Sequence, residues 1–186
     1  MSKPSWRTPA SQALRRAERP RRPPTDPQAA DAPRIAVVGI GQELQGDDGV
    51  GPEVVRRLRA QLRPADARPP RAPVLLILDA GPAPENQTGP LRRFAPDLVI
   101  LVDAARMEVS PGVVRWLAWE ETTGLSGSTH TLPPATLATY LTAELGCEVA
   151  LLGIQPTAVE FEASLSPAAE QAVHDVVAGL AQILQV

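Results

Sequence analysis

Two adjacent carboxylates, Asp47 and Asp48, lie in the glycine-rich stretch 39–51, which reads GIGQELQGDDGVG. Glycine-rich turns between a strand and a helix commonly bind phosphate, but two carboxylates would repel a phosphate group. The dinucleotide-binding fingerprint also fails, because Leu44 stands where its third glycine belongs, and no lysine follows Gly46 as a P-loop requires. The residues of this turn therefore favour a cation over a phosphate.

Three more side chains suited to chemistry lie at strand ends or in a polar loop. Asp79 ends the apolar run VLLILD, Asp103 ends LVILVD, and His130 lies in GSTHTLPP. Ligands of open α/β sheets bind beyond the carboxyl ends of the strands, where these acids are expected. Two carboxylates and one imidazole, from Asp48, Asp103 and His130, would suit a borderline divalent metal that must also contact water or a substrate.

Each of these residues has a structural alternative. Either Asp47 or Asp48 could cap the helix that follows, because acids ahead of a helix accept hydrogen bonds from its free N–H groups. Capping needs only one acid, so we assign capping and orientation to Asp47 and metal binding to Asp48. Asp103 could be a hydrogen-bonded structural acid, Asp79 a structural or orienting acid, and His130 a solvated loop histidine.

Other candidate nucleophiles and bases carry weaker signals. The stretch GLSGS (124–128) departs from the G-x-S-x-G nucleophile elbow, and no predicted strand leads into it. Cys147 opens a predicted strand and is expected to be a buried, inert thiol. His174 falls off the apolar face of the last predicted helix, so we expect a solvated surface residue.

The composition of the 186 residues indicates one soluble domain, with 44% hydrophobic and 21% charged residues. A net charge of −3 gives no general attraction to nucleic acid or to an anionic membrane. One cysteine excludes an internal disulfide and a cysteine-based zinc cluster, and the chain has only two histidines. No apolar stretch reaches the ~20 residues that span a bilayer, and no secretory signal is recognisable, so a cytoplasmic protein is expected.

Residues 1–33 differ from the rest of the chain. They hold 7 of the 21 prolines and carry Lys3 and six arginines against three acids. Such a segment cannot bury enough apolar surface to order itself, so we predict a disordered extension, with a short helix allowed at 10–19. An arm that binds nucleic acid or a partner is the functional alternative. The folded domain is expected over 34–186.

From Arg34 onward the chain alternates predicted strands and helices, which indicates a three-layer α/β/α domain with a mainly parallel sheet. Residues 112–119 alternate apolar and polar side chains, as expected of an edge strand. The predicted strands are 34–40, 73–81, 97–105, 112–119 and 147–156, and the predicted helices are 52–62, 133–145 and 166–184.

Several motifs, in order, resemble the hydrogenase maturation proteases, which trim the C-terminus of [NiFe]-hydrogenase large subunits. The resemblance covers roughly residues 34–184. Its motifs are VVGIGQELQGDDGVGPEVV, DAGPAPEN, LVILVDAARM followed by PGVVR, STHTLPP, and LLGIQPTAVEF followed by LSP. The stretches GPAPEN and GIQP look most like the branch that serves formate-hydrogenlyase hydrogenases. Gln42 stands where the family usually has Asn.

The resemblance implies a phosphorylase/hydrolase-like fold with five strands, one antiparallel, for which 112–119 is our candidate. It also implies that Asp48, Asp103 and His130 bind nickel carried by the large-subunit precursor, which is cut after nickel insertion. Asp47 or Asp79 would then orient the site or act as a base. The expected enzyme is a monomeric endopeptidase; a nickel-checkpoint chaperone, a general metallopeptidase and a nucleotide-binding protein are the alternatives.

Overall fold

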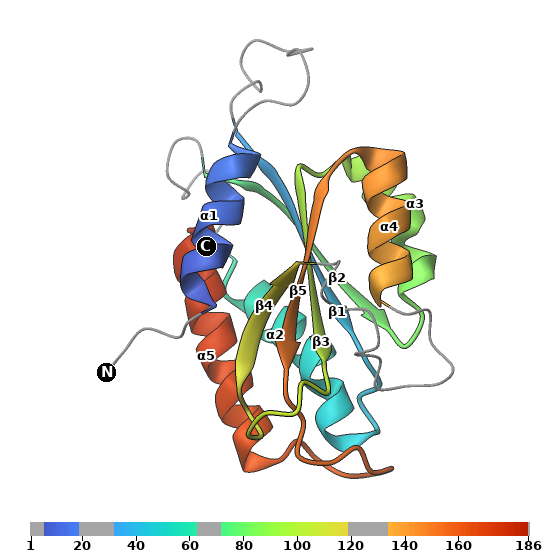
Figure 1. Cartoon of the computed structure of the whole chain (residues 1–186), viewed down its shortest axis with the longest axis vertical. Coiled ribbons are helices and arrows are strands. Elements are labelled where there is room, and N and C mark those ends of the chain that lie inside the picture. Colours follow the sequence, from blue (N-terminus) through green and yellow to red (C-terminus); the bar gives the residue numbers. More distant parts are fainter. Residues whose placement is uncertain (1–5, 19–31, 63–71, 119–133, 186) are drawn as a thin grey trace.

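The computed structural model describes residues 6–18, 32–62, 72–118 and 134–185, which form a five-stranded sheet between helices (Figure 1). The strand order is β2-β1-β3-β5-β4, and β4 alone of these strands runs antiparallel, against β5. The predicted mixed sheet and its antiparallel edge strand are confirmed. The strands are β1 (Arg34–Ile40), β2 (Val74–Gly81), β3 (Leu98–Ala104), β4 (Val114–Ala118) and β5 (Glu148–Ile154).

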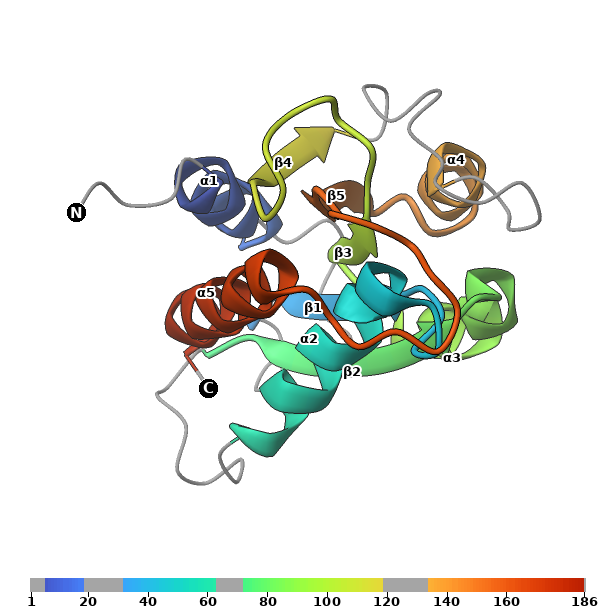
Figure 2. The ribbon, with the colours of Figure 1, turned by 90° about the horizontal axis from the view of Figure 1, so that it is seen from below.

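Helices cover both faces of the sheet, which confirms the three-layer α/β/α arrangement (Figure 2). Alternate residues of each central strand enter different cores: Ile35 and Val37 pack with α2 and α5, whereas Ala36 and Val38 pack with α3 and α4. The helices on the first face are α1 (Arg7–Ala17), α2 (Val50–Ala60) and α5 (Pro167–Leu184); those on the second are α3 (Thr88–Phe94) and α4 (Pro134–Leu145). Among the described residues, no helix is long and apolar enough to cross a membrane.

Two local expectations were wrong. Helix α3 and the short 3-10 helix η3 (Pro84–Gln87) lie where no helix was predicted, because prolines and glycines interrupt the apolar periodicity of that stretch. Leu62, the last residue of the helix predicted over 52–62, lies beyond the end of α2 and is exposed. The last helix begins as predicted, with the Ser166 hydroxyl accepting a hydrogen bond from the Ala169 N–H.

The predicted extension over 1–33 is not disordered in residues 6–18: the short helix allowed at 10–19 is present as α1, and it begins earlier, at Arg7. Helix α1 buries Trp6, Ala10, Ala13, Leu14 and Ala17, whose spacing forms one helical face, in the core that α5 shares. Its outer side holds Arg16, which forms an ion pair with Glu148 of β5. The average composition of the arm concealed this short amphipathic face. Residues 1–5 and 19–31 lie outside the described residues.

The contact between α1 and α5 can be tested with a double-mutant cycle. A Cβ at Gly179 would lie 2.5 Å from the Trp6 ring, so Gly179→Ala is expected to destabilise the wild-type protein. Trp6→Ala should lower the free energy of unfolding by roughly 3–5 kcal/mol. In the Trp6→Ala background Gly179→Ala should cost little, which gives a coupling energy of roughly 1–3 kcal/mol in urea unfolding. Additive effects would contradict the docking of α1 described here.

Candidate active site

The glycine-rich turn after β1 folds back tightly on the strand that leads into it. Gly41 has a φ of 133°, and a Cβ there would lie 1.8 Å from the Asp48 carbonyl oxygen. At Gly51, in the first turn of α2, a Cβ would meet the Ile40 carbonyl oxygen at 2.2 Å. Only glycine permits both approaches. The tight return places the 3-10 helix η1 (Gly46–Gly49), and with it both acids of the turn, at the carboxyl edge of the sheet.

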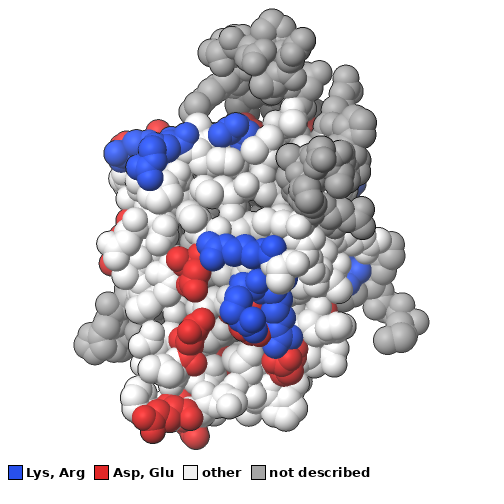
Figure 3. All heavy atoms as spheres, turned by 180° about the vertical axis from the view of Figure 1, so that it is seen from behind, with Lys and Arg blue, Asp and Glu red and all other residues white. Residues whose placement is uncertain are grey.

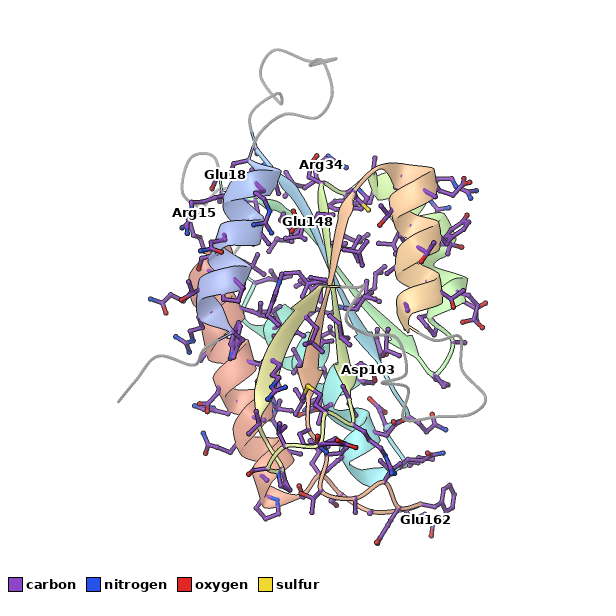
Figure 4. The ribbon with its side chains drawn as sticks, viewed as in Figure 1. Arg15, Glu18, Arg34, Asp103, Glu148 and Glu162 are labelled. Carbon is purple, nitrogen blue, oxygen red and sulfur yellow. The ribbon has the colours of Figure 1, made fainter. Side chains whose placement is uncertain are left out.

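Asp48 and Asp103 interact across this edge. Asp48 is half-buried, and its Oδ2 accepts a 2.8 Å hydrogen bond from the Gln42 backbone N–H. Burial raises the pKa of Asp48, and that hydrogen bond only partly offsets the effect. Asp103 lies near the end of β3 (Figure 4). Burial and the neighbouring Asp48 carboxylate raise the pKa of Asp103 to about 8, against a lowering hydrogen bond from the Ala104 backbone.

Asp47, which is 1% exposed, has the opposite environment. Its carboxylate accepts hydrogen bonds from the Thr157 N–H at 2.7 Å, the Ser166 N–H at 2.6 Å and the Ser166 hydroxyl at 2.8 Å. Burial alone would raise the pKa of Asp47, but these hydrogen bonds bring it below its ordinary value. Asp47 therefore fastens the turn to the segment after β5 and to the start of α5. Its predicted capping role was wrong, because no side chain caps η1 or α2.

A second anchor at this edge was not singled out from the sequence. Gln155, in the motif GIQP, accepts hydrogen bonds at its Oε1 from the Met107 N–H (2.7 Å) and the Val109 N–H (3.5 Å). The Gln155 N–H in turn donates to the Val113 carbonyl oxygen. These bonds hold the segment that follows Asp103 against the end of β5. The signal available in the sequence was a polar residue directly after the apolar run VALLGI.

The other residues singled out from the sequence at this site are Asp79, His130 and Gln42. Asp79 lies opposite Gly39 in the sheet register, but its carboxylate is exposed and accepts a hydrogen bond from the nearby Gly81 N–H. His130 lies outside the described residues. Gln42 contacts Asp48 through its backbone, and its φ is not positive, so the left-handed turn that would favour Asn is absent at this position.

Two expectations outside the site are met. Cys147 is buried, with its thiol 3.7 Å from the Leu141 carbonyl oxygen, and His174 is exposed on α5. Within the described part of the chain, no three His, Cys, Asp or Glu side chains form a group that could hold a metal ion. The structure thus brings together Asp48 and Asp103, two of the three predicted ligands.

Comparison with known proteins agrees with this fold. The profile of the hydrogenase maturation protease family (HycI) matches residues 52–183, a range that contains Asp103 and begins four residues after Asp48. The hydrogenase 3 maturation protease of Escherichia coli K12 is 30% identical over 138 residues, which cover 74% of this chain and 82% of that relative.

Solved structures show the same similarity. A crystal structure of the [NiFe] hydrogenase maturation protease HycI from Thermococcus kodakarensis superposes with a TM-score of 0.71 and 31% identity, over 82% of this chain and 93% of that one. The hydrogenase maturating endopeptidase HybD from E. coli gives a TM-score of 0.66 and 26% identity, over 82% and 92% of the two chains. Fold and sequence thus define a peptidase. The chain belongs to the hydrogenase maturation protease family.

The anchoring role of Asp47 predicts a large effect on stability. Asp47→Ala should lower the free energy of unfolding at pH 7 by roughly 2–4 kcal/mol, because it leaves the Thr157 and Ser166 N–H groups without their acceptor. The lowered pKa means that the ionised carboxylate stabilises the folded state at neutral pH, and that this contribution fades in acid. Urea unfolding should therefore show the difference from wild type shrinking as the pH falls toward 3; equal stabilities at pH 7 would contradict the assignment.

The raised pKa of Asp103 predicts the opposite pH dependence. The folded state keeps the Asp103 proton to about pH 8, whereas an unfolded aspartic acid loses it near pH 4, so this residue costs stability as the pH rises between these values. Asp103→Asn should gain stability relative to wild type as the pH rises from 5 to 8, by at most about 1.4 kcal/mol per pH unit, and should gain no more above pH 8. Parallel pH profiles in urea unfolding would show that Asp103 has no raised pKa.

Proposed function

We propose that the protein is an endopeptidase that removes the C-terminal tail of a [NiFe]-hydrogenase large-subunit precursor after nickel insertion. The precursor's own nickel would be the feature it recognises. The observation that carries this proposal is the pair of interacting carboxylates, Asp48 and Asp103, at the carboxyl edge of a maturation-protease fold. Both have raised pKa values.

The two carboxylates resist simultaneous ionisation, and a divalent cation between them would remove that repulsion. His130 is proposed as the third ligand. In sequence it precedes Pro134, the first residue of α4, by four positions. Helix α4 runs toward the start of β5, so its first turn faces the carboxyl side of the sheet (Figure 1). An O,O,N donor set with open positions suits nickel that keeps its other ligands in the precursor.

In this scheme the residues of the chain bind and position the substrate. Asp48 and Asp103 would bind nickel as carboxylates, so binding would release the proton that Asp103 otherwise holds. Fixing the nickel would fix the attached tail, which supplies the orientation part of catalysis. Asp47 would act indirectly by holding the turn, and Asp79 would orient the site or serve as a base. Bound nickel can also polarise a carbonyl group or a water molecule.

One experiment separates this function from its competitors. Purified protein is incubated with large-subunit precursor, loaded or not loaded with nickel, and the products are weighed by mass spectrometry. We expect one defined C-terminal cut in the nickel-loaded precursor and none in the nickel-free one. Cutting of both would indicate a general metallopeptidase. Binding without any cut would indicate a nickel-checkpoint chaperone.

The ligand assignment predicts the effect of single substitutions. Asp48→Asn and Asp103→Asn should each slow cleavage of nickel-loaded precursor by about 100-fold or more, because each removes a charged donor. Asp175→Asn, on the outer part of α5, serves as the matched control and should cleave at the wild-type rate. Quantified gels or mass spectra provide the measurement. Wild-type cleavage by Asp48→Asn would overturn the assignment.

A further inference from the structure

Two large apolar side chains project into solvent beside the candidate active site. Phe161 is 70% exposed and Leu44 is 58% exposed, the two highest values for large hydrophobic residues in the described part of the chain. Single exposed apolar residues are ordinary, but these two lie on loops whose backbones are in direct contact. The Glu162 N–H donates to the Leu44 carbonyl oxygen at 2.7 Å. The pair therefore forms one surface, which we call the Leu44–Phe161 surface.

This surface is held in place by several fixed contacts. Gln45 and Ala163 form an isolated parallel bridge, and the Gly46 N–H donates to the Ala163 carbonyl oxygen at 3.2 Å. Glu162 has a φ of 58°, a left-handed conformation that costs free energy in a residue other than glycine. The hydrogen bonds that Asp47 accepts close both ends of the segment 157–166. The side chains are thus displayed on an ordered loop pair.

The same loops carry acidic side chains. Glu43, Glu160 and Glu162 are exposed and adjoin Leu44 and Phe161 in sequence. In Figure 3 the charged side chains that show at the lower end of the molecule are acidic, and Figure 4 places Glu162 at that end. Arg106, on the segment after β3, is an exposed basic side chain at the same edge of the sheet. An apolar centre with an acidic rim suits a partner segment that combines apolar and basic side chains.

We propose that the Leu44–Phe161 surface docks the large-subunit precursor through a segment in which apolar side chains are flanked by lysine or arginine. This inference rests on the proposed function. Leu44 lies in the turn that the hydrogen bond from the Gln42 N–H to Asp48 Oδ2 closes, so a substrate that presents its nickel to Asp48 would lie close to this surface. Burying two exposed apolar side chains on binding gives affinity, and the acidic rim selects the partner.

Substitution of the apolar pair tests the docking. The double variant Leu44→Ser/Phe161→Ser should raise the KM for nickel-loaded precursor by about tenfold or more, with kcat within about twofold of wild type. Leu62→Ser is the matched control, because Leu62 is also an exposed leucine but lies beyond the end of α2. Thermal unfolding of each variant checks that the fold is intact. An unchanged KM for the double variant would overturn the proposal.

Reversing charge on the rim tests the chemistry of the partner segment. Glu160→Lys/Glu162→Lys should raise KM several-fold at low salt and abolish the loss of affinity that added salt causes in the wild type. Glu18→Lys, at the opposite end of the molecule (Figure 4), should leave KM unchanged. The same KM for the charge-reversed and wild-type enzymes would contradict a basic partner segment.

A cross-link gives a readout that does not depend on activity. Phe161→Cys would introduce an accessible thiol, because the chain's single cysteine, Cys147, is buried. With a thiol-linked photoreactive group at position 161, the precursor should be captured, and peptide mapping should identify a segment rich in apolar and basic residues. Capture of a second copy of this chain instead would overturn the proposal.

The failures of the two proposals are distinguishable. A wild-type protein that neither binds nor cuts nickel-loaded precursor defeats the proposed function, and the docking surface with it. A wild-type protein that cuts the precursor, with an unchanged KM in the double variant and no cross-link from position 161, defeats the docking surface alone.

Discussion

The candidate site depends on one buried carboxylate that is not itself a proposed metal ligand. Asp47 accepts hydrogen bonds from Thr157 and Ser166 and so ties the turn after β1 to the segment after β5 and the start of α5. These bonds join parts of the chain that no local interaction could hold together. The position of Asp48 and the pairing of the loops that display Leu44 and Phe161 both follow from this anchor.

The neighbouring acids Asp47 and Asp48 thus have pKa values that are shifted in opposite directions. Asp47 is buried among N–H and O–H donors, which favour its ionised form. Asp48 accepts one backbone hydrogen bond and interacts with Asp103, so the simultaneous ionisation of Asp48 and Asp103 is opposed. The first arrangement stabilises the fold, and the second keeps Asp103 protonated up to about pH 8. Under the proposed function, a cation that arrives with the substrate would displace this proton.

Helix α1, which precedes the first strand in the sequence, enlarges the core at a distance from the candidate site. Helix α1 packs Trp6 against Gly179 and pairs Arg16 with Glu148, near the amino ends of the parallel strands (Figures 1 and 4). The carboxyl edge, where Asp103 lies, is toward the other end of the molecule (Figure 4). Helix α1 therefore adds to the core at a distance from Asp48 and Asp103.

The pattern of strands and helices could be read from the sequence alone, because apolar periodicity is a local property. Alternation in residues 112–119 indicated an edge strand, the family resemblance supplied its antiparallel direction, and the strand ends indicated that acids gather at the carboxyl edge. The motif order indicated the family. The short helix allowed at 10–19 is α1, but its buried face was not predicted, since the composition of residues 1–33 masked it. Helix α3 was missed, since prolines and glycines broke its pattern.

Only the tertiary structure decided which acid of the pair is an anchor and which faces the site. Asp47 and Asp48 are chemically identical neighbours, and the local rule that favoured Asp47 as a helix cap was wrong. The partners of Asp47 come from residues 110 and 119 positions away in the chain, Thr157 and Ser166. No local pattern reports such contacts, because they exist only once β1, β5 and α5 have packed together.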